Sequence, residues 1–243
     1  MRNHHEKLRL RCQRALGHAV NNAGFYRIDP LERRTLLSLT IAQENALAGT
    51  PKSQWDISGA GDTTLQGFAT DMSVNVGGTI SFKIDDSTLG AYSISIYRLG
   101  YYAGNGARLI ATIPSSQITR TDQPNGLIDP TTQMLDCGNW SVSASWTVPV
   151  DTTSGVFIAD LVRTNGAKSQ IPFIVRNDAS HSDIVFQTSD STWQAYNDYG
   201  GKSLYNYQST NGQRAYAVSY NRPFNTRADS AGAPIIFPSP AHD

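Results

Sequence analysis

The sequence predicts a mainly β chain in which a β-sandwich is followed by the start of an α/β domain. Between residues 50 and 177, short apolar runs recur between turn residues, as the strands of a sandwich do. Two of these runs alternate apolar and polar residues strictly. After residue 182 the pattern changes to one short apolar run and then an aromatic stretch. This change indicates a second structural unit.

Seven runs are expected to form the strands of the sandwich. They are residues 73–76, 79–84, 92–98, 108–113, 142–148, 156–163 and 170–176. In the second run, alternation places Ile80, Phe82 and Ile84 on one face of the sheet. In the third run, Ile94 and Ile96 point inward for the same reason. Seven short strands with little helical signal favour an immunoglobulin-like or fibronectin-like sandwich.

Two local features refine this sandwich. Gly77 and Gly78 lie between the first two runs and supply the positive φ angles of a tight hairpin. The only cysteines, Cys12 and Cys137, are far apart and have no metal-ligand spacing. The paired cysteines of antibody domains are therefore absent, and kinship with antibody domains is not implied.

The region 178–227 reads as the beginning of an α/β domain. Residues 183–187 (DIVFQ) form an apolar run that predicts a buried strand. Residues 191–205 then combine three tyrosines, a tryptophan and a glycine pair without helical or strand periodicity, which is typical of a functional loop. In α/β domains, ligands gather beyond the strand ends. The Pro-, Ala- and Gly-rich residues 228–243 predict an irregular tail.

Residues 1–43 read as a basic leader that is disordered or weakly helical, ahead of a sandwich domain at 44–177. The leader carries 8 Lys and Arg against 3 Asp and Glu, whereas the remaining chain carries 12 against 17. Nucleic-acid binding is not expected, because the body has no basic stripe with interleaved aromatic residues. No run approaches the roughly 20 apolar residues of a membrane-spanning helix, so no membrane span is expected.

Residues 31–38 (LERRTLLS) resemble the LEPR-type leader element of large secreted or surface proteins of planctomycete bacteria. Arginine stands where the usual form of that element has proline. The resemblance implies that the protein is exported or displayed at the cell surface.

Six sequence blocks occur in an order that points to one family. They are QGFATD (66–71), IYRLGYY (96–102), DCGNW (136–140), SGVFIA (154–159), TWQAYN with GGKSLY (192–197 and 200–205), and VSYNRPF (218–224). Together, over residues 44–227, they resemble the large-subunit-like proteins of the N,N-dimethylformamidase family. The resemblance implies hydrolysis of small N-substituted amides by one iron ion held by tyrosine phenolates and a glutamate. A hard cation of this kind prefers anionic oxygen ligands, and it can polarise a carbonyl and activate water.

The resemblance also assigns roles to individual residues. The tyrosine of the TWQAYN block is Tyr196, which is the metal ligand that the resemblance implies. Trp193, Asn197 and Arg222 would then surround the metal or line the substrate pocket. Tyr199 and Tyr205 are expected to be structural aromatic residues.

The ligand set that the family uses is incomplete in this sequence. The second tyrosine and the glutamate of the family lie beyond the 218–224 block. Here the 19 residues after Phe224 contain neither residue type, and no glutamate follows Glu44. We therefore expect a truncated or frameshifted product, or a second chain or homo-oligomer that completes the site. Alone, the chain is expected to be inactive as an amidase.

An alternative hypothesis from a different functional class stays open at this point. The sandwich is also compatible with a secreted or surface binding module that recognises carbohydrate. Tyr101, Tyr102 and Trp140 would then be exposed and would stack on sugar rings.

Overall fold

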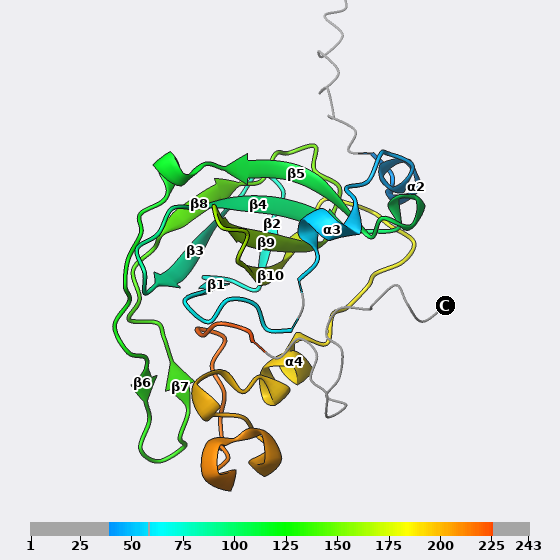
Figure 1. Ribbon diagram of the computed structural model, residues 1–243. Helices are drawn as coiled ribbons and strands as arrows, with labels where there is room; N and C mark the ends of the chain where they lie inside the picture. The colour runs from blue at the N-terminus through cyan, green and yellow to red at the C-terminus, as the bar shows by residue number, and fades with distance from the viewer. Residues whose placement is uncertain (1–38, 58, 226–243) are drawn as a thin grey trace, which may run out of the picture. The chain divides into compact units, whose positions relative to one another are not determined.

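The computed structural model describes residues 39–57 and 59–225, and these residues form a mainly β structure (Figure 1). The strands are β1 (Leu65–Ala69), β2 (Ser73–Asn75), β3 (Thr79–Asp86), β4 (Tyr92–Leu99), β5 (Ala107–Ile113), β6 (Leu127–Ile128), β7 (Leu135–Asp136), β8 (Ala144–Thr147), β9 (Gly155–Arg163) and β10 (Lys168–Arg176). The helices are α2 (Ile41–Asn45), α3 (Lys52–Trp55) and α4 (Asp190–Tyr196). Short 3-10 turns are η1 (Tyr102–Gly104), η2 (Ser115–Gln117), η3 (Tyr199–Gly201), η4 (Asn206–Gln208) and η5 (Thr210–Gly212).

Two sheets make the sandwich. One has the order β2-β10-β9-β4-β5 and the other the order β1-β3-β8, while β6 and β7 form a separate two-stranded sheet. All pairs are antiparallel except β2 with β10, which is parallel. The predicted mainly β fold and its seven predicted strands are therefore confirmed. Strands β1, β6 and β7 were not predicted.

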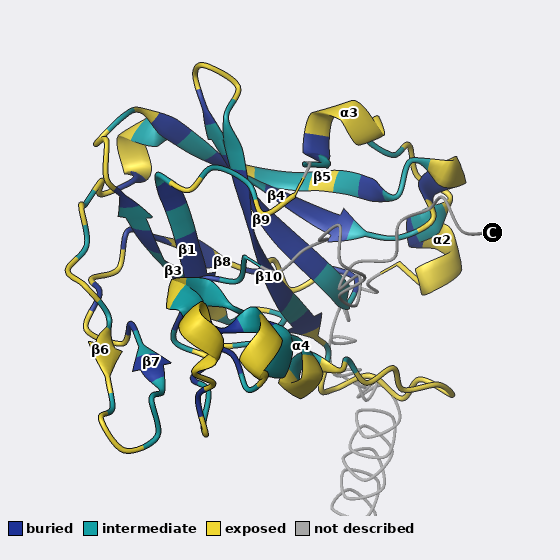
Figure 2. Cartoon of the chain, turned by 60° about the horizontal axis from the view of Figure 1, so that its bottom comes forward, coloured by how far each residue is buried: buried dark blue, intermediate teal, exposed yellow. Residues whose placement is uncertain are grey.

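The sandwich core has the alternating pattern that the sequence predicts. Ile80, Phe82 and Ile84 from one sheet and Ile94 and Ile96 from the other are all fully buried in a single apolar cluster. Figure 2 shows buried residues gathered along the strands of the two sheets. Burial of branched and aromatic side chains from both inner faces is the main favourable contribution to folding of such a sandwich.

Four aromatic rings occupy the centre of this core. Phe82, Trp146, Phe157 and Phe173 lie with ring centroids 5.6 to 6.1 Å apart, in tilted and edge-to-face arrangements. These geometries avoid face-to-face repulsion between ring quadrupoles. Phe173 contacts each of the other three rings, so it joins both sheets in one packed unit.

Strand β1 carries a glycine because two neighbours leave no room for a side chain. A Cβ at Gly67 would lie 2.7 Å from the Lys83 carbonyl oxygen and 3.0 Å from Ile171 Cδ1. The close approach lets β10 of the second sheet pack directly on β1. Glycine weakens the strand signal in the sequence, which explains why β1 was not predicted.

The hairpin predicted at Gly77 and Gly78 is wrong. Gly77 does adopt a positive φ of 78°, but β2 and β3 belong to different sheets. The glycine pair therefore turns the chain from one sheet to the other. Gly77 N donates to the Val148 carbonyl at 2.9 Å, which fixes this corner.

Helix α2 is attached to the sandwich through a buried carboxylate. Thr40 caps the helix, with Gln43 completing a capping box. Glu44 accepts hydrogen bonds from Tyr102 Oη and Arg108 Nε, each at 2.7 Å. Because Glu44 is only 2% exposed, its charge requires these partners.

Two of the six sequence blocks meet beside this carboxylate. Arg98 of the 96–102 block donates to the carbonyl of Ser154 in the 154–159 block at 2.8 Å, and to Tyr102 Oη at 3.0 Å. The arginine is 3% exposed. These two blocks therefore form a structural network inside the sandwich.

The local predictions for 183–187 and 191–205 are wrong. Residues 183–187 form no strand, and Ile184, Val185 and Phe186 are 84%, 88% and 81% exposed. The aromatic stretch begins as a helix, α4, rather than as a loop. Its only buried residue is Gln194, so the sequence carries no apolar helical stripe. Asp190 in the first turn favours the helix by its interaction with the helix dipole.

No helix within residues 39–57 and 59–225 is long and apolar enough to cross a membrane. The predicted leader at 1–43, with the 31–38 element, lies almost entirely outside the described residues, as does the tail at 228–243.

Replacing Phe173 by alanine should lower the free energy of unfolding by about 3–5 kcal/mol, because it removes a fully buried ring at the centre of the core. Leu109→Ala is the matched control: this side chain on β5 is 41% exposed, and its loss should cost less than about 0.5 kcal/mol. Urea unfolding followed by tryptophan fluorescence measures both. Equal losses for the two variants would contradict the assigned core.

Candidate functional site

Residues 178–225 pack on the sandwich through a small second core. Phe68 of β1, Leu135, Cys137 and Trp140 form a buried cluster against which Tyr199 packs. Trp140 lies 5.6 Å from the Phe68 ring and 6.5 Å from the Tyr199 ring, measured between centroids. Burial raises the pKa of the Cys137 thiol to about 12, so this cysteine is unreactive at neutral pH.

This packing corrects the carbohydrate-binding hypothesis. Trp140 is 5% exposed and Tyr102 is fully buried, so neither can stack on a sugar. Of the three aromatic residues in that hypothesis, only Tyr101 is exposed. A single tyrosine does not make a sugar platform.

Asp136 connects the 136–140 block to the 218–224 block. Its carboxylate accepts hydrogen bonds from Ser219 Oγ at 2.5 Å, Asn221 Nδ2 at 3.2 Å and the Gly138 amide at 2.6 Å. The Cys137 amide donates to the Asn221 carbonyl at 2.6 Å. Burial acts to raise the pKa of Asp136, but these hydrogen bonds outweigh it and hold the pKa below its ordinary value.

Arg222 connects the 218–224 block to helix α4. Its guanidinium donates to the carbonyls of Gln194 at 2.9 Å and Asn197 at 3.1 Å, and also to that of Lys202. The last carbonyls of a helix lack partners within the helix, and a cation there also favours the helix dipole. Burial lowers the pKa of Arg222 to about 10, so it stays protonated at neutral pH.

Asn197 holds the other side of the same junction. It is fully buried; its Nδ2 donates to the Pro223 carbonyl at 2.9 Å, and its Oδ1 accepts from the Asn225 amide at 3.3 Å. The Asn197 amide donates to the Trp193 carbonyl at 2.9 Å and closes α4. Asn197 and Arg222 therefore hold the end of α4 and residues 222–225 together.

Tyr196 is the last residue of α4, and its ring packs against phenols from the segment that follows the helix. Its ring stacks on that of Tyr205, with centroids 4.4 Å apart, and the Tyr207 ring lies 5.7 Å from that of Tyr205. The hydrogen bond between the Tyr196 and Tyr205 hydroxyls raises the pKa of Tyr205, because Tyr205 keeps its proton while it donates. Tyr199, in contrast, packs on Trp140, and burial raises its pKa as well.

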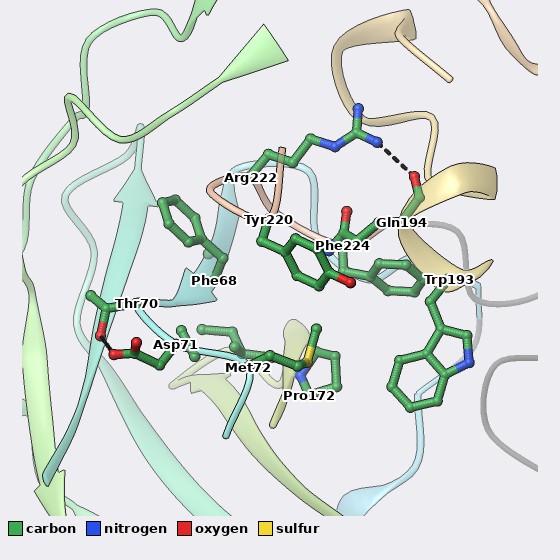
Figure 3. A pocket seen from close by; sticks show the side chains of 13 residues that line it. Phe68, Thr70, Asp71, Met72, Pro172, Trp193, Gln194, Tyr220, Arg222 and Phe224 are labelled. Carbon is green, nitrogen blue, oxygen red and sulfur yellow. Dashed lines mark hydrogen bonds between the residues drawn. The ribbon is translucent and has the colours of Figure 1, made fainter. Parts of the chain in front are cut away.

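A shallow hollow lies between the sandwich and α4 (Figure 3). Trp193 and Arg222, both predicted site residues, are among its lining residues, whereas Tyr196 and Asn197 are not. The full lining is Gly67, Phe68, Ala69, Thr70, Asp71, Met72, Ile171, Pro172, Trp193, Gln194, Tyr220, Arg222 and Phe224.

Sequence reasoning missed the hollow, although the signal for it was present. Asp71, Tyr220 and Phe224 belong to the 66–71 and 218–224 blocks, which lie about 150 positions apart in the sequence. Both blocks and the 192–197 block converge at this hollow. Their order along the chain could not reveal that convergence.

In the part of the chain that the structure describes, no group of three or more His, Cys, Asp and Glu residues could hold a metal ion. Tyr196 stacks on Tyr205, and Tyr207 lies next to Tyr205, so three phenols come together here. These phenols have the ligand chemistry that the sequence resemblance implies for tyrosine, and the glutamate of that ligand set is not supplied by a cluster among the described residues.

A protein-family model matches more than half of the chain. Residues 93–236 match the family model described as "N,N-dimethylformamidase beta subunit-like, C-terminal". No curated protein matches the chain.

A solved structure of Pseudomonas fluorescens alkylpurine DNA glycosylase AlkC, bound to DNA containing an abasic site analog, has 9% sequence identity and a TM-score of 0.26. The match covers 46% of this chain and spans 30% of that chain's length. At that TM-score it carries no argument about fold or function.

Asp136→Asn should weaken attachment of the C-terminal segment at neutral pH. Since the folded pKa lies below the ordinary 3.8, the carboxylate's stabilising contribution is present above that pH. It is lost as the pH falls through the folded value. The difference in urea midpoint between wild type and variant should be largest near pH 7 and shrink below pH 4. A difference that grows on acidification would contradict the assignment.

Arg222→Met should lower the free energy of unfolding by about 3 kcal/mol, because it leaves buried carbonyls of Gln194, Asn197 and Lys202 without donors. Arg214→Met is the control, since this arginine is exposed and lies over the face of the Tyr216 ring. Its replacement should cost less than about 0.5 kcal/mol. Chemical denaturation compares the two, and equal effects would refute the role of Arg222.

Proposed function

Because this chain belongs to the N,N-dimethylformamidase beta subunit-like family, we propose that it is a component of an iron-dependent amidohydrolase acting on small N-substituted amides. The family match carries this proposal, since it spans β4 to α4 and includes the 218–224 block. When bound, the iron would polarise the amide carbonyl and lower the pKa of a bound water.

Tyr196 is the residue that we propose as an iron ligand from this chain. Its helix is held by Arg222 and Asn197, which would present the phenol oxygen in a fixed position. Tyr205 stacks on the Tyr196 ring, and a hydrogen bond joins the two hydroxyls, so Tyr205 would help to orient the Tyr196 oxygen. Trp193 and Arg222 border the adjacent hollow, and Asn197 supports the helix end behind it.

The remaining iron ligands must come from outside the described residues. We propose that a second chain, or a second copy of this one, supplies them, in keeping with a family named for one subunit of an enzyme. Export, which the 31–38 element implies, is part of the same proposal: the enzyme would act at or beyond the cell surface.

The purified chain loaded with ferric or ferrous iron should not release dimethylamine from N,N-dimethylformamide. Mass spectrometry of the metal should find less than one iron per chain. The reason is that the described residues combine the phenols of Tyr196, Tyr205 and Tyr207 with no metal-binding group of His, Cys, Asp and Glu residues. Hydrolysis by the chain alone, with stoichiometric iron, would contradict this expectation.

The ligand role of Tyr196 is tested separately by ferric titration followed at visible wavelengths, where iron phenolates absorb. Tyr196→Phe should abolish any such band. Tyr101→Phe, which removes an exposed phenol on the sandwich, should leave the band unchanged. A band that survives Tyr196→Phe would exclude Tyr196 as the ligand.

A further inference from the structure

The hollow beside α4 is walled by four aromatic rings from separate parts of the chain. Phe68 comes from β1, Trp193 from α4, and Tyr220 and Phe224 from the stretch that follows η5. In Figure 3 Met72 and Pro172 lie below Tyr220 and Phe224, with Phe68 on one side and Trp193 on the other. An aromatic box is an attractive environment for a soft cation, because ring faces carry negative charge density.

The rings are held in place by the surrounding structure. Phe68 is 4% exposed and packs on Trp140. Tyr220 Oη donates to Asp190 Oδ2 at 2.9 Å, and burial together with this hydrogen bond raises the pKa of Tyr220 to about 12. Tyr220 is therefore a neutral phenol at physiological pH, and its hydroxyl is already engaged. Phe68 and Tyr220 therefore do not have to be repositioned when a ligand arrives.

The charges around the hollow favour a positively charged occupant. Asp71 lies at its rim in the turn between β1 and β2, and it forms no salt bridge with any residue of the described chain. Thr70 Oγ1 donates to its carboxylate at 3.2 Å, and Figure 3 shows this carboxylate on the Thr70 side of the hollow, at the end away from Trp193. Asp190 places a second carboxylate at the hydroxyl end of Tyr220, outside the lining of the hollow.

The one cation among the lining residues is turned away from this space. Arg222 is 1% exposed and directs its guanidinium to main-chain carbonyls, as Figure 3 shows for that of Gln194. Arg222 Nε has no hydrogen-bond partner among the described residues, but this atom is buried. An anionic ligand in the hollow would meet the Asp71 carboxylate at its rim. An anion is therefore disfavoured at this site.

We propose that this hollow binds a small N-methylated ammonium ion. The N-methyl groups bury apolar surface against Phe68, Trp193 and Phe224, while the positive charge faces the ring faces and Asp71. Unmethylated ammonium is too strongly hydrated to gain from such a box, and a neutral apolar molecule gains nothing from the carboxylate. The site requires neither iron nor amide hydrolysis, although hydrolysis of an N-methylated amide would release a cation of this class.

The test is a titration of the full chain with choline chloride, followed by two-dimensional NMR of backbone amides and indole N–H groups. The neutral isostere 3,3-dimethyl-1-butanol and sodium chloride are titrated in parallel. Choline should shift the Trp193 indole and amides near residues 70–72 and 220–224 in a saturable manner. The isostere should bind about tenfold more weakly, as a cation–π contact plus a carboxylate predicts.

Variants assign the interaction to its residues. Asp71→Asn keeps the side-chain shape and should weaken choline binding about fivefold or more while leaving the isostere unaffected. Asp151→Asn, at an exposed turn on the sandwich, should change neither. Trp193→Leu should weaken choline at least as strongly as Asp71→Asn, with thermal unfolding used to verify that the variant is folded.

Three results would overturn the proposal. They are shifts that sodium chloride reproduces, equal affinity for choline and the isostere, and wild-type choline affinity in a folded Asp71→Asn variant. If Trp193→Leu fails to fold, the choline affinity of the Asp71→Asn variant relative to wild type still tests the proposal.

Discussion

The buried guanidinium of Arg222 is the constraint on which the C-terminal half of the structure depends. A charge that is 1% exposed must have acceptors, and here it finds carbonyls of Gln194, Asn197 and Lys202. Those carbonyls come together only if α4 ends where it does and the chain then turns back. One side chain therefore fixes the helix that carries Tyr196 and the wall of the neighbouring hollow.

A second set of contacts, made by Asp136, attaches the C-terminal segment to the sandwich. Asp136 binds Ser219 and Asn221, three and one positions before Arg222. The aromatic contacts of Trp140 with Phe68 and Tyr199 cover the same junction. The sandwich core is independent of these contacts, whereas the C-terminal segment has few buried apolar residues and relies on them.

The sandwich was largely predictable because alternation is a local property of the sequence. The face of Ile80, Phe82 and Ile84 follows from period-two spacing alone. The glycine pair at 77–78 predicted a turn. It carried no information about the pairing of β2 with β10, which lies a hundred positions later in the sequence. Residues 183–187 have strand-forming composition, yet a strand also needs a neighbouring strand, and among the described residues they have none.

The candidate site was predictable only in part. The sequence blocks named Trp193 and Arg222, and both border the hollow. Tyr220, Phe224 and Asp71 were missed as lining residues because their convergence is a long-range property. The carbohydrate hypothesis required Trp140 and Tyr102 to be exposed, but both are buried. Trp140 packs in the small core beneath Tyr199, and Tyr102 hydrogen-bonds Glu44 of α2.

Hydrogen–deuterium exchange of the wild-type chain tests most directly whether Arg222 and Asp136 hold the C-terminal segment on the sandwich. Peptides containing the Asn197 amide and the Cys137 amide, which donate to Trp193 and Asn221, are the informative ones. They should be protected well above peptides from the exposed stretch 181–187. Exchange of these amides as fast as that stretch, with β9 and β10 still protected, would contradict the account.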